Sequence, residues 1–218
     1  MHSSPLLHIE KLNFAYPGEP LLLRDWACSI GPGVTQLFGD TGSGKSTLLR
    51  LIAGALPASG QLTLAGLRQD AAREAYRRHV FYVDPTTEVF DQVTGRACTD
   101  TLSAGDAGFD ATRWQALVEA FKLVEHIDKP MYMLSTGSKR KVWLAAGLAS
   151  GRTLVLLDEP TGGLDGPSVR ALWTSLGAWA EGRDRAVLVA SSEHIERVPL
   201  AAVVSLPHGP HGPHGLRG

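Results

Sequence analysis

A glycine-rich stretch at residues 39–47 combines the residue types that bind a phosphate chain. It reads Gly-Asp-Thr-Gly-Ser-Gly-Lys-Ser-Thr and fits the pattern G-x-x-x-x-G-K-[ST]. Glycines tolerate positive φ and carry no Cβ, so successive backbone N–H groups can turn toward one anion. Lys45 would reach the outer phosphates, and Ser46 would offer its hydroxyl to Mg²⁺. The predicted phosphate-binding residues are Gly39, Asp40, Thr41, Gly42, Ser43, Gly44, Lys45, Ser46 and Thr47.

The segments on either side of this stretch supply the context that a phosphate site needs. Residues 34–38 are apolar enough for a buried strand, and residues 48–53 continue as a helix. A helix that begins at the loop adds the positive end of its dipole to the site. The order of strand, glycine loop and helix favours a nucleotide site over the alternative, a glycine-rich turn with a chance lysine.

Two adjacent carboxylates follow a second apolar run at residues 154–157. A strand that ends in Asp158 places this carboxylate at the carboxyl edge of a sheet, beside the glycine loop. We therefore expect Asp158 to hold Mg²⁺ and Glu159 to polarise the attacking water as a general base. The alternative is a surface Asp-Glu pair after a core strand.

Apolar patterns along the chain predict an α/β fold. Residues 6–16 and 21–30 alternate and predict an antiparallel hairpin at the edge of the fold. Residues 153–157 and 186–190 lack alternation, which is typical of central parallel strands covered on both faces. Further strands are expected at residues 61–66, 79–83 and 201–206, and a helix at 166–180.

Residues 86–149 differ in character, because their apolar side chains recur at helical spacing. Residues 111–121 show this best, with Trp114, Leu117, Val118 and Phe121 three and four positions apart. We expect a helical subdomain inserted between strands, within one domain that spans residues 1–206. The His-Gly-Pro repeat at 207–218 is expected to be a disordered tail, with metal binding by its histidines as the alternative.

Composition excludes several classes of partner. The 218-residue chain has a formal net charge of −1, which gives no global field that favours nucleic acid. The two cysteines, Cys28 and Cys98, form no metal-binding spacing and suit a reducing compartment. No run of about 18 apolar residues occurs, and the N-terminus does not read as a signal peptide. Any link to a membrane must therefore run through a partner.

With these motifs in place, the chain resembles the single nucleotide-binding subunit of a bacterial ATP-binding cassette (ABC) transporter over nearly all of its length. Residues 134–138, Leu-Ser-Thr-Gly-Ser, are similar to the family signature Leu-Ser-Gly-Gly-Gln. In the family this segment caps the ATP of the opposite subunit, a role that the resemblance gives to Ser135 and Gly137. Tyr16 resembles the aromatic residue that stacks on adenine. Asp165 matches the aspartate of the family's dimer-contacting loop.

Three positions depart from the family pattern. Thr136 replaces a glycine of the signature, and a β-branched residue disfavours the positive φ that close approach to phosphate could need. Asp84 stands where a Mg²⁺-binding glutamine is usual, and Gln92 lies too far along to replace it. Ser192 stands where a histidine contacts the γ-phosphate, with His194 two residues on. These departures predict slow hydrolysis or a need for a partner that completes the site.

The resemblance implies an ATPase with an ABC-type core, an antiparallel edge sheet and a helical subdomain. ATP and Mg²⁺ are the implied cofactors, with Glu159 and Lys45 catalytic and with Ser46, Asp158 and Asp84 as metal ligands. The implied partners are a membrane permease and a second ABC subunit, with no nucleic acid, and the implied location is cytoplasmic, on the inner face of the cell membrane. The alternatives are a degenerate ATP-binding partner of a competent subunit and a soluble ABC ATPase without a transport role.

Overall fold

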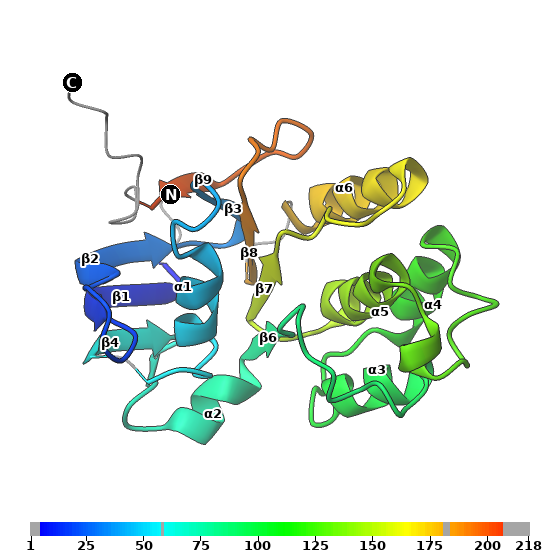
Figure 1. Ribbon diagram of the computed structural model, residues 1–218, viewed down its shortest axis with the longest axis horizontal. Coiled ribbons are helices and arrows are strands. Elements are labelled where there is room, and N and C mark those ends of the chain that lie inside the picture. Colours follow the sequence, from blue (N-terminus) through cyan, green and yellow to red (C-terminus); the bar gives the residue numbers. More distant parts are fainter. Residues whose placement is uncertain (1–4, 58, 181–183, 207–218) are drawn as a thin grey trace.

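The computed structural model describes residues 5–57, 59–180 and 184–206 and contains two sheets (Figure 1). One sheet has four strands in the order β2-β1-β4-β5, and the other has five in the order β6-β7-β8-β3-β9. This is the α/β arrangement expected from the sequence, with an antiparallel sheet beside a parallel core. Within the described ranges, no helix has both the length and the apolar character to cross a bilayer.

The five-stranded sheet is parallel throughout, and its pairing aligns the ends of its central strands. Phe38 pairs with Ser191, and Asp158 pairs with Ala190. The loops that follow these strands therefore leave the same edge of the sheet, as the sequence patterns predicted. The strands of this sheet are β6 (Val80–Tyr82), β7 (Leu154–Asp158), β8 (Ala186–Ser191), β3 (Gly33–Phe38) and β9 (Ala202–Ser205).

The antiparallel sheet contains the hairpin predicted for residues 6–16 and 21–30. Leu7 pairs with Ile30 on one side and with Leu64 on the other. Leu7 and Ile9 are buried, whereas His8 between them is exposed, so the period of two holds. The strands of this sheet are β1 (Leu7–Phe14), β2 (Leu23–Ile30), β4 (Ser59–Leu64) and β5 (Leu67–Arg68).

Helix α1 (Lys45–Ile52) fills the space between the two sheets. Its Leu48, Leu49 and Leu51 are fully buried and share one core cluster with Leu7 of β1 and Leu156 of β7. A helix that is apolar on several sides cannot face water, so burial fixes its position. The glycine loop that precedes α1 is therefore held against both sheets.

The chain between β6 and β7 contains most of the helical structure. Figure 1 shows this region in green, on the far side of the parallel strands from the antiparallel sheet in blue. Its long helix α5 packs on α3 and α4 and shares a core cluster with β7 and β8. The helices here are α3 (Gly95–Ser103), α4 (Ala111–Ala120), the 3₁₀ turn η1 (Met131–Met133) and α5 (Thr136–Ala149).

Sequence patterns located some helices and missed others. The helix predicted at residues 111–121 is α4, and the one predicted at 166–180 is α6 (Gly166–Ala180). Helix α3 lies in the block at 86–149 that was expected to be helical, although its own bounds were not predicted, and α2 (Arg73–Arg78) was not predicted. Both helices are short and contain few apolar residues. Residues 207–218, expected as a disordered tail, lie outside the described residues.

Two helical glycines offer a matched test of core packing. A Cβ on Gly147 of α5 would lie 2.7 Å from Cε1 of Phe81, whereas one on Gly177 of α6 would meet nothing within 4 Å. We expect Gly147→Ala to lower the free energy of unfolding by about 1–3 kcal/mol through overpacking. Gly177→Ala should raise it by about 0.5–1 kcal/mol, because it removes backbone entropy from the unfolded chain. Urea denaturation measures both, and equal effects would contradict the packing described.

Candidate nucleotide-binding site

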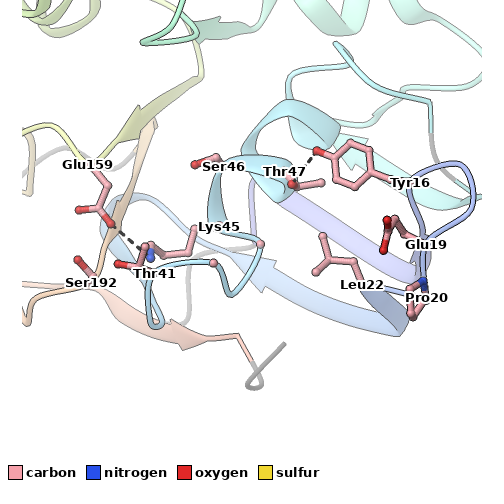
Figure 2. A pocket seen from close by; sticks show the side chains of 12 residues that line it. Tyr16, Glu19, Pro20, Leu22, Thr41, Lys45, Ser46, Thr47, Glu159 and Ser192 are labelled. Atoms are coloured by element: carbon pink, nitrogen blue, oxygen red, sulfur yellow. Dashed lines mark hydrogen bonds and ion pairs between the residues drawn. The ribbon is translucent and has the colours of Figure 1, made fainter. Parts of the chain in front are cut away.

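A cavity of about 610 Å³ opens beside the glycine loop, a volume typical of small-ligand sites. Figure 2 shows Tyr16 toward one end of this cavity and Glu159 at the other, with the glycine loop and the start of α1 between them. Segments far apart in sequence thus meet in one place. The cavity is lined by Tyr16, Glu19, Pro20, Leu22, Thr41, Gly42, Gly44, Lys45, Ser46, Thr47, Glu159 and Ser192.

The glycine loop owes its shape to backbone conformations that favour glycine. Gly42 has φ +82 and Gly44 has φ +97, both in the left-handed region. A Cβ on Gly44 would also lie 3.0 Å from a methyl of Leu22. Gly44 begins α1, and none of the described side chains caps this helix end. The unpaired N–H groups of the first turn are therefore available to an anion in the cavity.

Lys45 is buried and is held at the inner end of the cavity. Its Nζ donates to the carbonyl oxygen of Gly39 at 2.7 Å and to that of Asp40 at 3.0 Å. The same Nζ lies 3.3 Å from Oε1 of Glu159 (Figure 2). The glycine loop thus folds around its own lysine. A bound phosphate would compete with Glu159 for this ammonium group.

Asp158 has the character of a metal ligand. Burial raises the pKa of its carboxyl group, the charges of Glu159 and Asp84 raise it further, and a hydrogen bond with Ser46 opposes them. Its Oδ1 is buried without a hydrogen-bond partner among the described residues. A buried carboxylate oxygen beside a hydroxyl, in a locally negative field, fits a hard divalent cation such as Mg²⁺.

Asp84, predicted as a third metal ligand, already has hydrogen bonds to both carboxylate oxygens. Arg50 Nε donates to Oδ2 at 2.8 Å, and Thr86 donates to Oδ1 from its backbone N–H at 3.0 Å and its hydroxyl at 2.7 Å. Burial raises the pKa of Asp84, but the bonds from Thr86 and Arg50 outweigh it and leave the pKa lowered. Asp84 does not line the cavity. In this structure it ties the loop after β6 to α1.

Tyr16 is anchored at the end of the cavity away from Glu159. Its hydroxyl lies 3.0 Å from Oγ1 of Thr47, and its ring meets Phe14 edge to face with centroids 4.9 Å apart. The side chain is partly exposed and lines the cavity. This leaves the ring free to contact a planar ligand, and the adenine-stacking role that the resemblance implies stays a prediction.

The loop after β8 sends Ser192, and not His194, to the cavity. Ser192 is part of the lining. His194 is exposed, and its ring stacks on that of Phe38 with centroids 3.9 Å apart and planes 16° apart. The alignment that put Ser192 at the family's histidine position therefore matches its place in the structure, whereas His194 lies in a separate hollow with Trp173.

The signature-like segment lies outside the cavity of its own chain. Ser135 is the N-cap of α5, and its Oγ accepts a hydrogen bond from Ser138 N at 3.2 Å. Gly137 packs so closely on the carbonyl of Gly163 that a Cβ there would overlap it. The prediction that the β-branched side chain of Thr136 conflicts with the backbone is wrong. Thr136 is the first residue of α5, and its backbone is helical with a negative φ.

Several residues of the site region gave no signal in the sequence. Glu19, Pro20 and Leu22 line the cavity, but the sequence indicated only a hairpin turn at Glu19 and Pro20 and the start of a strand at Leu22. For Arg50, which binds Asp84, the sequence indicates only a place in the helix after the glycine loop. For Arg140 it indicates only a place in the helix after the signature, and the contacts of Arg140 with the turn after β7 are seen only in the structure.

The fold and the site define a nucleotide-binding ATPase with a glycine-rich phosphate loop. Comparison with known proteins identifies the family of ATPases to which the chain belongs. The chain belongs to the ABC transporter family, whose model matches residues 23–162. Within it, the chain is an ATP-binding subunit, and proteins of this kind are ATPases. The family resemblance and the fold class expected from the sequence are thereby confirmed.

The similarities extend over most of the chain. The chain is 32% identical over 214 residues to the zinc import ATP-binding protein ZnuC of Halorhodospira halophila, covering 94% of this chain and 75% of the relative. It is 34% identical over 184 residues to the cobalt import ATP-binding protein CbiO of Rhodobacter capsulatus, and this match covers 79% of this chain and 65% of the relative. A solved ATP-binding subunit of an ABC transporter shares the fold, with a TM-score of 0.73 at 22% identity over 85% of this chain and 79% of that chain.

The ring of Tyr16 offers a direct test of the cavity as a nucleotide site. We expect Tyr16→Ala to weaken ATP binding by roughly 5- to 150-fold, the loss of one ring stacked on a base. Tyr16→Phe keeps the ring and loses only the bond to Thr47, so its affinity should stay within about fivefold of wild type. Titration calorimetry measures both, with Tyr132→Ala, a tyrosine outside the cavity, as control. An unchanged affinity in Tyr16→Ala would exclude the stacking role.

Proposed function

We propose that this chain binds MgATP in the cavity, hydrolyses it slowly as half of a two-chain assembly, and thereby drives a separate membrane permease. One observation carries the proposal: a single cavity unites a partly exposed aromatic ring, a phosphate-binding loop and the carboxylate of Glu159. These are the parts that adenine, the phosphates and an attacking water require.

Binding follows from the order of these parts along the cavity. The adenine ring would stack on Tyr16, and the phosphates would lie on the backbone N–H groups of the glycine loop and the first turn of α1. Ser46 and Asp158 would hold Mg²⁺. When bound, Mg²⁺ would neutralise charge on the β- and γ-phosphates. Lys45 would contribute the second positive charge at the same end.

Catalysis would begin when a bound phosphate replaces Glu159 as the ion-pair partner of Lys45. The ammonium and the carboxylate are 3.3 Å apart, so a γ-phosphate at the ammonium would compete with the carboxylate and release it. The Glu159 side chain is 40% exposed, which leaves it open to water. A free carboxylate within hydrogen-bond reach of that water can act as the general base.

The place of the signature segment supports a two-chain site. Ser135 and Gly137 do not line the cavity of their own chain, although the first turn of α5 has a form suited to a phosphate. A second subunit, identical or related, would bring its own α5 to the open side of the cavity. Asp165 would help to join the chains, and Lys141 and the Ser168 N–H already hold it at 2.7 and 2.8 Å.

An exposed apolar surface supports a permease partner. Val89 is 76% exposed, and Tyr132 and Met133 are 58% and 61% exposed. The backbone N–H of Tyr132 donates to the carbonyl of Asp91 at 3.0 Å, so these side chains belong to neighbouring segments. Exposed apolar side chains that gather on neighbouring segments are typical of a surface that binds a partner protein. We assign this surface to the permease, and we propose that the chain works in the cytoplasm, on the inner face of the membrane.

The degenerate-partner alternative keeps one observation in its favour. Ser192 lines the cavity where the family's histidine would stand, and a serine hydroxyl is a weaker donor to a phosphate than an imidazolium. The presence of Glu159 at the same cavity favours slow hydrolysis over none.

The general-base role of Glu159 is testable by one substitution. We expect Glu159→Gln to bind ATP normally and to lose about 10²- to 10⁴-fold in turnover, because an amide cannot accept the proton of water. Phosphate release by the purified chain measures turnover. Glu196→Gln, which removes an exposed carboxylate outside the cavity, should turn over like wild type. A wild type no faster than Glu159→Gln would end the catalytic proposal.

The position of Ser192 predicts a gain of activity. Ser192→His would bring a charge-capable donor to the phosphate end of the cavity, and we expect turnover to rise about tenfold or more. His194→Ala should leave turnover at the wild-type rate, because the ring of His194 stacks on Phe38 outside the cavity. A loss of turnover in His194→Ala, with no gain in Ser192→His, would reverse the assignment of the two residues.

A further inference from the structure

The backbone of Glu159 adopts a conformation that needs support. Its φ is +40°, in a region that residues other than glycine rarely occupy. The direction of its side chain depends on this backbone. Its N–H donates to the carbonyl of Ala190 at 3.0 Å, and its carbonyl accepts from the N–H of Gly162 at 3.1 Å. Residues 159–162 thus form a tight turn after β7.

A side chain from another element completes the support of this turn. Nη1 of Arg140 donates to the carbonyl oxygen of Glu159 at 3.1 Å and also to the carbonyl oxygen of Gly162. A Cβ on Gly162 would overlap the same nitrogen. The guanidinium therefore occupies the space that a side chain at position 162 would fill, and it joins the two ends of the turn.

The neighbours of Arg140 have different targets. Lys139 pairs with Asp91 at 2.5 Å, in the loop after β6, and Lys141 pairs with Asp165 at 2.7 Å. Three consecutive basic residues in the first turns of α5 thus contact two loops: Lys139 contacts the loop after β6, whereas Arg140 and Lys141 contact different points of the loop between β7 and α6. Of these three basic residues, Arg140 alone binds the turn of Glu159, and it does so through backbone carbonyls.

We propose that Arg140 is a positioning residue for ATP hydrolysis. It holds the turn at residues 159–162 so that the Glu159 carboxylate points into the cavity. The inference rests on the proposed function of Glu159 as the general base. Because Ser135 caps the same helix, a movement of α5 at one nucleotide site would carry Arg140 and shift Glu159 at the other. Arg140 would thereby connect the two sites of the assembly through a single chain.

Substitutions at Arg140 can distinguish a role in positioning Glu159 from a role in folding and from an effect of the positive charge. We expect Arg140→Ala to lower kcat for ATP hydrolysis by about 10- to 100-fold, the scale of a misplaced catalytic group. The Kd for ATP should not change, because Arg140 does not line the cavity. Arg140→Gln keeps a hydrogen-bond donor without the charge and should recover part of the lost kcat. Arg96→Ala removes an arginine from an exposed ion pair with Asp128 and should behave like wild type.

A double substitution separates failure of this inference from failure of the proposed function. If Arg140 acts through Glu159, Arg140→Ala should cause no further loss of kcat in a Glu159→Gln background. A wild-type kcat in Arg140→Ala, with Glu159→Gln inactive, would overturn the role of Arg140 and leave the proposed function intact. A wild-type rate in Glu159→Gln would overturn the proposed function. A fall in kcat together with weaker ATP binding and a lower Tm, without recovery in Arg140→Gln, would show a merely structural role.

Discussion

The site depends first on the register of three buried parallel strands. β3, β8 and β7 pair so that Phe38 lies beside Ser191 and Asp158 beside Ala190. The glycine loop, Ser192 and Glu159 follow these strand ends and must share one edge. A slip of one residue would turn each side chain to the opposite face of the sheet and exchange the residues of β7 and β8 between two separately packed core clusters. The cavity is thus a consequence of core packing.

Polar tethers then hold the loops that the strands bring together. Gln36, fully buried in β3, donates to the carbonyl of Glu193 at 2.7 Å and accepts from the N–H of Ile195 at 3.3 Å, which fixes the loop after β8. Arg50 holds the loop after β6, and Arg140 the turn after β7. The Gln36 tether satisfies a fully buried polar side chain, and the other two tethers join partly buried groups. The loops at the site are therefore linked to the packing of the helices that carry the tethers.

The sequence predicted those parts of the fold and site that local patterns encode. Apolar runs located the core strands, and the spacing of glycines and lysine at residues 39–47 located the loop that lines the cavity. The prediction that Thr136 disturbs the backbone of the signature segment is wrong, because Thr136 is the first residue of α5 and has a helical backbone. The role of Arg140 could not be predicted, since it depends on how α5 packs beside β7, a contact between residues distant in sequence.

In the mechanism that we propose, one chain supplies only part of each hydrolysis site. Sedimentation velocity of the Glu159→Gln variant, with and without MgATP, tests this most directly, because the variant should retain ATP without consuming it. We predict a monomer without nucleotide and a dimer with MgATP, or a heterodimer once a related subunit is added. A chain that binds MgATP, hydrolyses it as wild type, and remains monomeric throughout would contradict the account.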